Sequence, residues 1–190
     1  MNRTEVKLSG FGGQGIILAG VIVGQAVSIF DGKNATLTQD YGPEARGGSC
    51  SAQVVISDEP ASYPYVTNPS VLVAMSQEAY TKNTAELDED VPVLIDEDLV
   101  EPEKQTKRRI LAIPATRIAQ ELGRRAVANI VMLGFLTAIT DIVPLEAMKK
   151  SVLASVPKGT EELNTKAFER GYTYGKERIK SEVRRKIAKT

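Results

Sequence analysis

The sequence contains no histidine, and its single cysteine is Cys50. Without histidine, Ser-His-Asp triads, imidazole general bases and every metal site that uses an imidazole ligand are excluded. A single cysteine cannot form an internal disulfide, and it cannot by itself hold a zinc ion or an iron–sulfur cluster. Any redox chemistry must therefore use groups carried by a partner.

The chain also lacks a charge bias and a long apolar run. Its 190 residues include 24 basic and 24 acidic side chains, so nothing in the balance of charge favours nucleic acid or a membrane surface. No run reaches the ~18 apolar residues of a membrane span, and residues 1–5 lack the apolar core of a signal peptide. We therefore expect a cytoplasmic protein with no nucleic-acid or membrane partner, folded as a single domain over residues 1–190.

The most informative stretch is residues 6–17, an apolar strand that breaks into glycines and continues as a helix. Gly10, Gly12 and Gly15 match the pattern G-x-G-x-x-G, and Gly13 is an additional glycine. Missing Cβ atoms let backbone N–H groups approach an anion, and the dipole of the following helix adds partial positive charge. The pattern favours a ligand that carries phosphate. The same glycines also suit a strand-to-helix turn that serves close packing alone.

The rest of the chain alternates predicted strands and helices. Strands are expected at 35–39, 50–57, 70–75, 91–96 and 109–113, and helices at 16–30, 77–87, 116–122 and 130–139. Pro144 is placed at a helix start, and the predicted N-caps are Thr116, Asn129 and Asn164. This order predicts an α/β domain with an open, mostly parallel or mixed sheet, helices on both faces and a helical C-terminal third.

The segment 40–49 argues against a dinucleotide-binding fold. Such a fold needs an acidic residue at the end of its second strand, where Asp40 stands, and then a helix that crosses to a third parallel strand. Glycines and a proline break the segment before the next strand, so that helix does not fit. The sequence therefore disfavours NAD and FAD as ligands.

Three spaced motifs together resemble a known family. They are Gly-Phe-Gly-Gly-Gln-Gly-Ile at 10–16, Tyr-Gly-Pro-Glu-Ala-Arg-Gly-Gly at 41–48 and Pro-Lys-Gly-Thr-Glu-Glu-Leu-Asn at 157–164. In this order, over roughly residues 5–180, they closely resemble the gamma subunit of 2-oxoacid:ferredoxin oxidoreductases. The second motif looks most like the 2-oxoglutarate branch. The branched-chain and pyruvate branches are similar, and a related indolepyruvate oxidoreductase subunit has a similar first loop.

The resemblance implies a subunit that is not active alone. In the family, a complex decarboxylates a 2-oxoacid, transfers the acyl group to coenzyme A (CoA) and reduces ferredoxin. Thiamine diphosphate, magnesium and iron–sulfur clusters belong to the alpha, beta and usually delta partner subunits, and this chain is expected to hold none of them. The resemblance also implies that this subunit helps to bind CoA.

The two glycine-rich motifs are the predicted CoA site. Backbone N–H groups of the first motif would meet the phosphates, Arg46 would supply a cation for bidentate contact, and the two glycines after it would permit close approach. The residues assigned to ligand contact are Gly12, Gly13, Gln14, Gly15, Arg46, Gly47 and Gly48. No residue is assigned to catalysis or to a metal.

Alternatives remain open at this stage. Arg46 also has Glu44 and Asp40 as possible ion-pair partners, or it could contact another subunit. Tyr41 is expected in packing or in an interface, and Cys50 in the core. Two rival functions are a purely structural subunit, whose loops pack against partners, and a stand-alone Rossmann-type enzyme.

Overall fold

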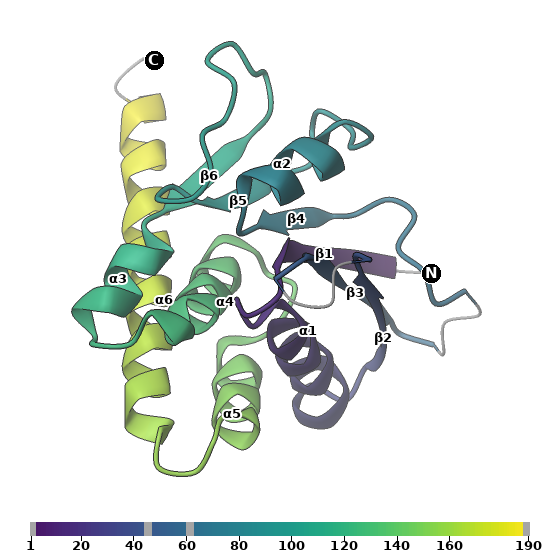
Figure 1. Cartoon of the computed structure of the whole chain (residues 1–190), viewed down its shortest axis with the longest axis vertical. Coiled ribbons are helices and arrows are strands. Elements are labelled where there is room, and N and C mark those ends of the chain that lie inside the picture. The colour runs from purple at the N-terminus through teal and green to yellow at the C-terminus, as the bar shows by residue number, and fades with distance from the viewer. Residues whose placement is uncertain (1–2, 44–46, 60–62, 188–190) are drawn as a thin grey trace.

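The first glycine-rich motif lies at the end of a central strand of the sheet. The structure, a computed structural model, describes residues 3–43, 47–59 and 63–187. Six strands of the described chain form one mixed sheet in the order β2-β3-β1-β4-β5-β6 (Figure 1). Their bounds are β1 (Arg3–Phe11), β2 (Asn34–Tyr41), β3 (Ser49–Ser57), β4 (Val71–Ala74), β5 (Val93–Asp96) and β6 (Ile110–Ile113). Strands β1, β4, β5 and β6 are parallel, whereas β3 is antiparallel to both β1 and β2.

The β2–β3 pair confirms that the chain lacks the dinucleotide-binding topology at this point. The two strands pair antiparallel, from Asn34 opposite Ser57 to Tyr41 opposite Cys50. The chain therefore returns directly along its neighbour instead of crossing to a parallel strand. One expectation was wrong in detail, because β2 continues through Tyr41 and Asp40 lies inside the strand rather than in a loop.

Helices cover both faces of the sheet, as the sequence predicted. They are α1 (Ile16–Gln25), which continues as the π-helix η1 (Ala26–Phe30), α2 (Gln77–Thr84), α3 (Ala115–Glu121), the short 3₁₀ helix η2 (Arg125–Val127), α4 (Ala128–Ile139), α5 (Leu145–Ser155) and α6 (Glu161–Ile187). Helix α2 packs on one face, and the main core on the other face draws on α1, α3, α4, α5 and α6. None of these helices is long and apolar enough to cross a membrane.

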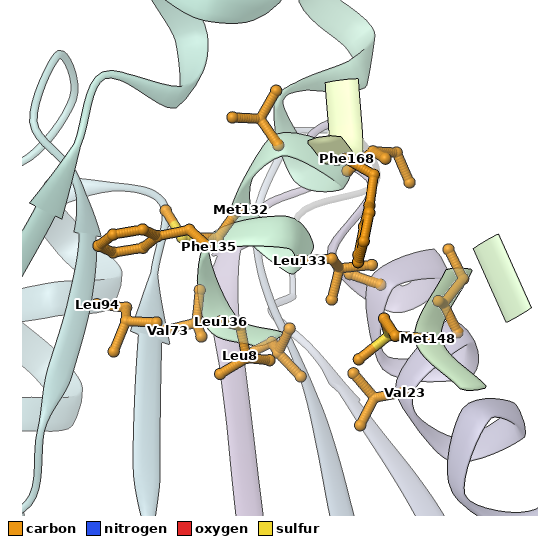
Figure 2. Close-up of a cluster of buried hydrophobic side chains, with 14 of the residues drawn as sticks. Leu8, Val23, Val73, Leu94, Met132, Leu133, Phe135, Leu136, Met148 and Phe168 are labelled. Atoms are coloured by element: carbon orange, nitrogen blue, oxygen red, sulfur yellow. The ribbon is translucent and has the colours of Figure 1, made fainter. Parts of the chain in front are cut away.

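Helix α4 is the centre of the main core. Every residue from Ala128 to Ala138 is buried, so this helix contacts other elements on all sides. Figure 2 shows its side chains between Leu8, Val73 and Leu94 of the sheet and Phe168 of α6. Its burial accounts for the apolar run in the sequence after Asn129.

Helices α4 and α6 touch through their backbones. A Cβ atom added to Gly134 would lie 2.1 Å from the carbonyl oxygen of Phe168, and one added to Gly171 would lie 1.9 Å from that of Val131. Farther along, a Cβ on Gly175 would meet Ala138 at 2.5 Å. The contacts advance in the same direction along both helices, so α4 and α6 are parallel and their N-termini lie together.

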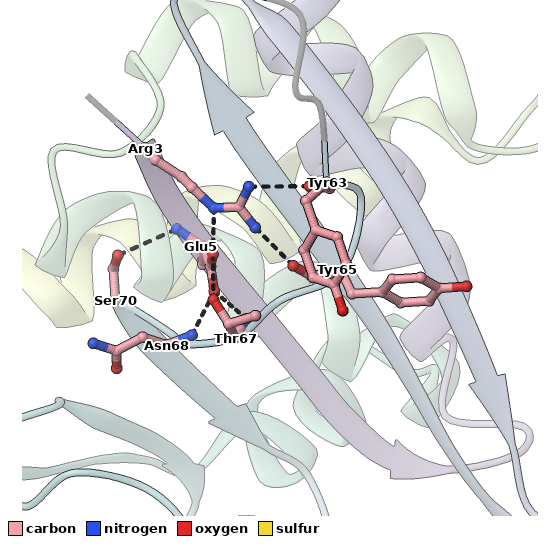
Figure 3. Close-up of polar contacts among 7 residues, drawn as sticks. All are labelled: Arg3, Glu5, Tyr63, Tyr65, Thr67, Asn68 and Ser70. Carbon is pink, nitrogen blue, oxygen red and sulfur yellow. Dashed lines mark hydrogen bonds and ion pairs between the residues drawn. The ribbon is translucent and has the colours of Figure 1, made fainter. Parts of the chain in front are cut away.

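A buried carboxylate fixes the connection that leads into β4. Glu5 is 3% exposed and accepts hydrogen bonds from the backbone N–H groups of Thr67 at 2.6 Å and Asn68 at 2.7 Å (Figure 3). Arg3 pairs with the same carboxylate and also donates to the carbonyl oxygens of Tyr63 and Tyr65. This network holds the segment that delivers β4 to its place beside β1.

The three predicted N-caps were wrong. Helix α3 begins at Ala115, α4 at Ala128 and α6 at Glu161, so Thr116, Asn129 and Asn164 all lie inside their helices. Each of the three is buried, and the first two bond across the fold, Thr116 to Asp96 and Asn129 to Gly15. A cap must instead turn its oxygen to its own helix end. Pro144 does precede α5, which confirms that prediction.

The contact between α4 and α6 predicts opposite effects for two glycine substitutions. Gly171→Ala should lower the free energy of unfolding by about 1–3 kcal/mol, because its methyl group overlaps a backbone carbonyl. Gly24→Ala should raise it by about 0.5–1 kcal/mol, because Gly24 lies within α1 and the added carbon would meet no described atom within 4 Å beyond the adjoining backbone of its own helix. Urea unfolding of both variants checks this. Equal or greater stability of Gly171→Ala would contradict the packing described.

Candidate functional site

The first glycine loop, residues 12–15, leaves the carboxyl end of β1 at a topological switch point. From β1 the chain passes to α1 on one face of the sheet, whereas from the neighbouring parallel strand β4 it passes to α2 on the other face. In open α/β sheets, ligands bind in the crevice at such a point, outside the carboxyl ends of the strands. The motif identified in the sequence therefore occupies the expected ligand site of this fold.

Two glycines give this loop its path. Gly13 has φ 92° and Gly15 has φ 73°, and residues with a Cβ atom rarely adopt such left-handed values. Gly12 instead meets the second glycine loop, residues 42–48. Its N–H donates to the carbonyl oxygen of Gly48 at 2.8 Å, and a Cβ there would lie 3.4 Å from the nitrogen of Gly47. The two sequence motifs are thus in direct contact.

The backbone donors of the first loop fall into two groups. The N–H of Gly12 bonds to Gly48, and the N–H of Gln14 bonds to the carbonyl oxygen of Phe11 at 3.1 Å. The N–H groups of Gly13 and Gly15 form no hydrogen bond with any described residue. Among the described residues, these two donors are therefore the loop's candidates for contact with a ligand.

A first cavity, of about 250 Å³, lies where three helices begin. Its wall includes Gly15 and Leu18 at the start of α1, Asn129 and Ile130 at the start of α4, and, at the start of α6, Thr160, Leu163 and Asn164. Helix N-termini carry partial positive charge and unpaired N–H groups. The convergence of three of them, together with Arg124 on the same wall, makes this cavity suited to an anion.

A second cavity, of about 370 Å³, lies on the other side of the loop. It is lined by Gly12, Gly13, Gln14, Met75, Leu99, Thr116, Arg125, Ala126 and Ala128. Gly13 and Ala126 also line the first cavity, so the two cavities adjoin each other at the loop. This cavity combines an apolar wall with one guanidinium group.

Sequence reasoning missed the two arginines. Arg124 and Arg125 are exposed, and within the described part of the chain neither forms an ion pair. They follow the left-handed Gly123 between α3 and α4, where Arg125 begins η2, more than a hundred residues after the glycine loop that they approach. The sequence does carry one local signal for them, namely two consecutive basic residues before an apolar helix.

A buried carboxylate anchors the wall of the second cavity. Asp96 ends β5 with 0% exposure, and it accepts hydrogen bonds from the Thr116 backbone N–H at 3.0 Å and the Thr116 hydroxyl at 2.6 Å. The N–H of Asp98 donates to its other oxygen at 3.2 Å. Burial raises the pKa of Asp96, and the bonds from Thr116 oppose this shift. The carboxylate fixes the first turn of α3, which carries Thr116 into the cavity wall.

Other predicted residues have different outcomes. Arg46 and Glu44 lie outside the described residues, so contact of Arg46 with a ligand or with Glu44 stays a prediction. Cys50 is buried in the main core, as predicted, and burial raises the pKa of its thiol. Tyr41 is 63% exposed, and its hydroxyl donates to Gln39. Within the described residues, no group of three His, Cys, Asp or Glu side chains is placed to hold a metal.

The family model for pyruvate ferredoxin/flavodoxin oxidoreductase matches residues 5–174. The chain belongs to this family. It is 54% identical over 178 residues to the 2-oxoglutarate synthase subunit KorC of Methanocaldococcus jannaschii, with coverage of 92% of this chain and 95% of that protein. The gamma subunit of a keto/oxoacid ferredoxin oxidoreductase from Geobacter sulfurreducens has the same fold, with a TM-score of 0.80, 43% identity and coverage of 90% and 98%. The chain is therefore a gamma-type subunit of a 2-oxoacid:ferredoxin oxidoreductase complex, as the motifs predicted.

A more distant structure places the same fold within a longer chain. The 2-oxoglutarate:ferredoxin oxidoreductase of Magnetococcus marinus, solved with 2-oxoglutarate, coenzyme A and succinyl-CoA bound, matches with a TM-score of 0.82 at 22% identity. The match covers 93% of this chain and 31% of that chain. The fold is therefore one part of a larger polypeptide in that protein.

The raised pKa of Asp96 predicts a pH-dependent effect of its removal. The pKa of Asp96 in the native state lies above the unfolded value of about 4. Between these two pKa values the native state therefore binds more protons than the unfolded state. The stability due to this group then falls as pH rises through that window. The neutral amide of Asp96→Asn has no such dependence. The stability deficit of this variant should therefore shrink between pH 4 and pH 7, measured by urea unfolding with exposed Asp141→Asn as the control. A deficit that grows with pH would contradict the assignment.

Proposed function

We propose that this chain positions coenzyme A in a 2-oxoglutarate:ferredoxin oxidoreductase complex. The complex would decarboxylate 2-oxoglutarate, transfer the succinyl group to the CoA thiol and pass two electrons to ferredoxin. One observation carries the proposal: Gly13, whose N–H has no acceptor among the described residues, lines both cavities, and each cavity has its own arginine. The 54% sequence identity to the 2-oxoglutarate synthase subunit KorC supports 2-oxoglutarate as the substrate.

The chemistry of this site fits the anionic half of CoA. CoA carries a diphosphate and a ribose phosphate, and helix N-termini with glycine-loop N–H groups bind such groups. Guanidinium groups bind phosphate through paired hydrogen bonds, so Arg124 and Arg125 would hold phosphate oxygens on the two sides of the loop. Arg46, predicted from the sequence, would be a third cation.

The reacting groups would belong to partner subunits. This chain has no histidine, and its one cysteine is buried in the core. We assign thiamine diphosphate, magnesium and the iron–sulfur clusters to alpha, beta and delta partners, and ferredoxin to the role of electron acceptor. The role of this chain is then to bind and orient the acyl acceptor in the cytoplasmic complex.

A purely structural role is the second candidate, and one contact favours it. The Gly12 N–H bonds to Gly48 of the second loop, so part of the glycine content serves packing within the chain. In that case the N–H groups of Gly13 and Gly15 would face a partner subunit rather than a ligand. The two candidates share their partners and differ in whether CoA contacts this chain.

Arginine variants of the assembled complex distinguish the two candidates. Arg124→Ala, Arg125→Ala and Arg46→Ala should each raise the KM for CoA by about 10–100-fold, the loss expected for a charged hydrogen bond to phosphate. The KM for the 2-oxoacid should stay unchanged. Arg109→Ala is the matched control, because it removes an exposed arginine that directly precedes β6. Unchanged CoA kinetics in all three variants would favour the structural role.

Purification under anaerobic conditions tests the partners and the substrate. The tagged chain should co-purify with thiamine-binding and cluster-binding subunits, identified by mass spectrometry. The purified complex should reduce ferredoxin with 2-oxoglutarate and CoA at a higher kcat/KM than with pyruvate or branched-chain 2-oxoacids. A higher kcat/KM with another 2-oxoacid would contradict the substrate assignment, and recovery of the chain alone would contradict the partners.

A further inference from the structure

Gln14 joins two parallel strands across the switch point through its side-chain amide. Its Oε1 accepts a hydrogen bond from the N–H of Phe11 at 2.6 Å, and its Nε2 donates to the carbonyl oxygen of Met75 at 2.7 Å. Phe11 ends β1, and Met75 follows β4. Only a side chain with both an acceptor and a donor makes these two bonds together.

Asn129 holds the other end of the same loop. Its Nδ2 donates to the carbonyl oxygen of Gly15 at 3.1 Å, and its Oδ1 accepts from the N–H of Ile130 at 2.9 Å. The side chain is 3% exposed and packs so closely that a Cβ on Gly15 would lie 2.3 Å from Nδ2. The carbonyl of Gly15 also accepts the N–H of Ala19, the first hydrogen bond of α1. Asn129 therefore ties α4 to the start of α1.

We propose that Gln14 and Asn129 are positioning residues that hold the first glycine loop in its ligand-binding conformation before the ligand arrives. Gly13 and Gly15 have wide conformational freedom in an unrestrained chain, and ordering them on binding would weaken affinity. The two amides fix the loop at both ends and leave the N–H groups of Gly13 and Gly15 without an acceptor among the described residues. This inference rests on the proposed function for the identity of the ligand, CoA.

The amides act through the loop, which refines the role predicted from the sequence for Gln14. Its backbone N–H bonds to Phe11, and both polar ends of its side chain bond within the chain. The contribution of Gln14 to CoA binding is then the shape of the loop rather than a donor offered to the ligand.

Two isosteric variants of the assembled complex test the proposal. Gln14→Met and Asn129→Leu remove the amide bonds without adding charge, and Asn34→Leu is the matched control. That control also removes an amide bond to a backbone carbonyl, the 3.0 Å bond from Asn34 to Asp58, but at the far edge of the sheet. Both test variants should raise the KM for CoA about tenfold, the loss expected for a buried hydrogen bond, with kcat within about twofold of the parent.

Amide hydrogen exchange, measured without CoA, supplies the second readout. The N–H groups of Gly12 and Gln14 keep their acceptors in both variants, so faster exchange there, by about tenfold, reports a loosened loop. Unchanged exchange would overturn the proposal. A raised KM without faster exchange would also overturn it, because the amides would then contact the ligand directly, and so would faster exchange with an unchanged KM. The exchange measurement is made without CoA, so it tests the positioning role by itself. The arginine variants test the proposed function, because an unchanged KM for CoA in all of them would mean that CoA binds elsewhere.

Discussion

The backbone contact between α4 and α6 determines where the proposed ligand site lies. Gly134 and Gly171 let the two helices touch without intervening side chains, and the contact fixes them as a parallel pair. Parallel helices bring their N-termini to the same end, and Asn129 joins that end to the start of α1. Residues from the N-termini of all three helices then line one cavity. Like partial charges at close range repel, so this arrangement is most favourable with an anion between them.

The two glycine loops contribute to the proposed site through two other properties of glycine. Gly12 allows the second loop to approach, whereas Gly13 and Gly15 supply left-handed backbone that turns the chain into α1. Gly12 therefore serves packing within the chain, whereas Gly13 and Gly15 are the glycines proposed to contact the ligand. The hydrogen bonds decide which donors remain available, because Gly12 and Gln14 use theirs within the chain.

Much of the fold was predictable because its signals are local. Glycine spacing placed the first loop, and the glycines and proline after Tyr41 indicated that no crossover helix follows β2. What failed depends on contacts between distant segments. Thr116 and Asn129 have the residue types of helix caps, but burial gives their side chains partners across the fold. The position of Arg124 and Arg125 could not be predicted for the same reason, because only the packing of α4 brings them to the loop.

The most direct test is the structure of the assembled complex with CoA bound, determined by electron cryo-microscopy under anaerobic conditions. A CoA phosphate should lie within hydrogen-bond distance of the N–H of Gly13 or Gly15, with the guanidinium of Arg124 or Arg125 on the same phosphate or the next one. If every CoA phosphate lay on other subunits, and partner side chains filled both cavities beside the glycine loop, the proposed role of this chain in binding CoA would be wrong.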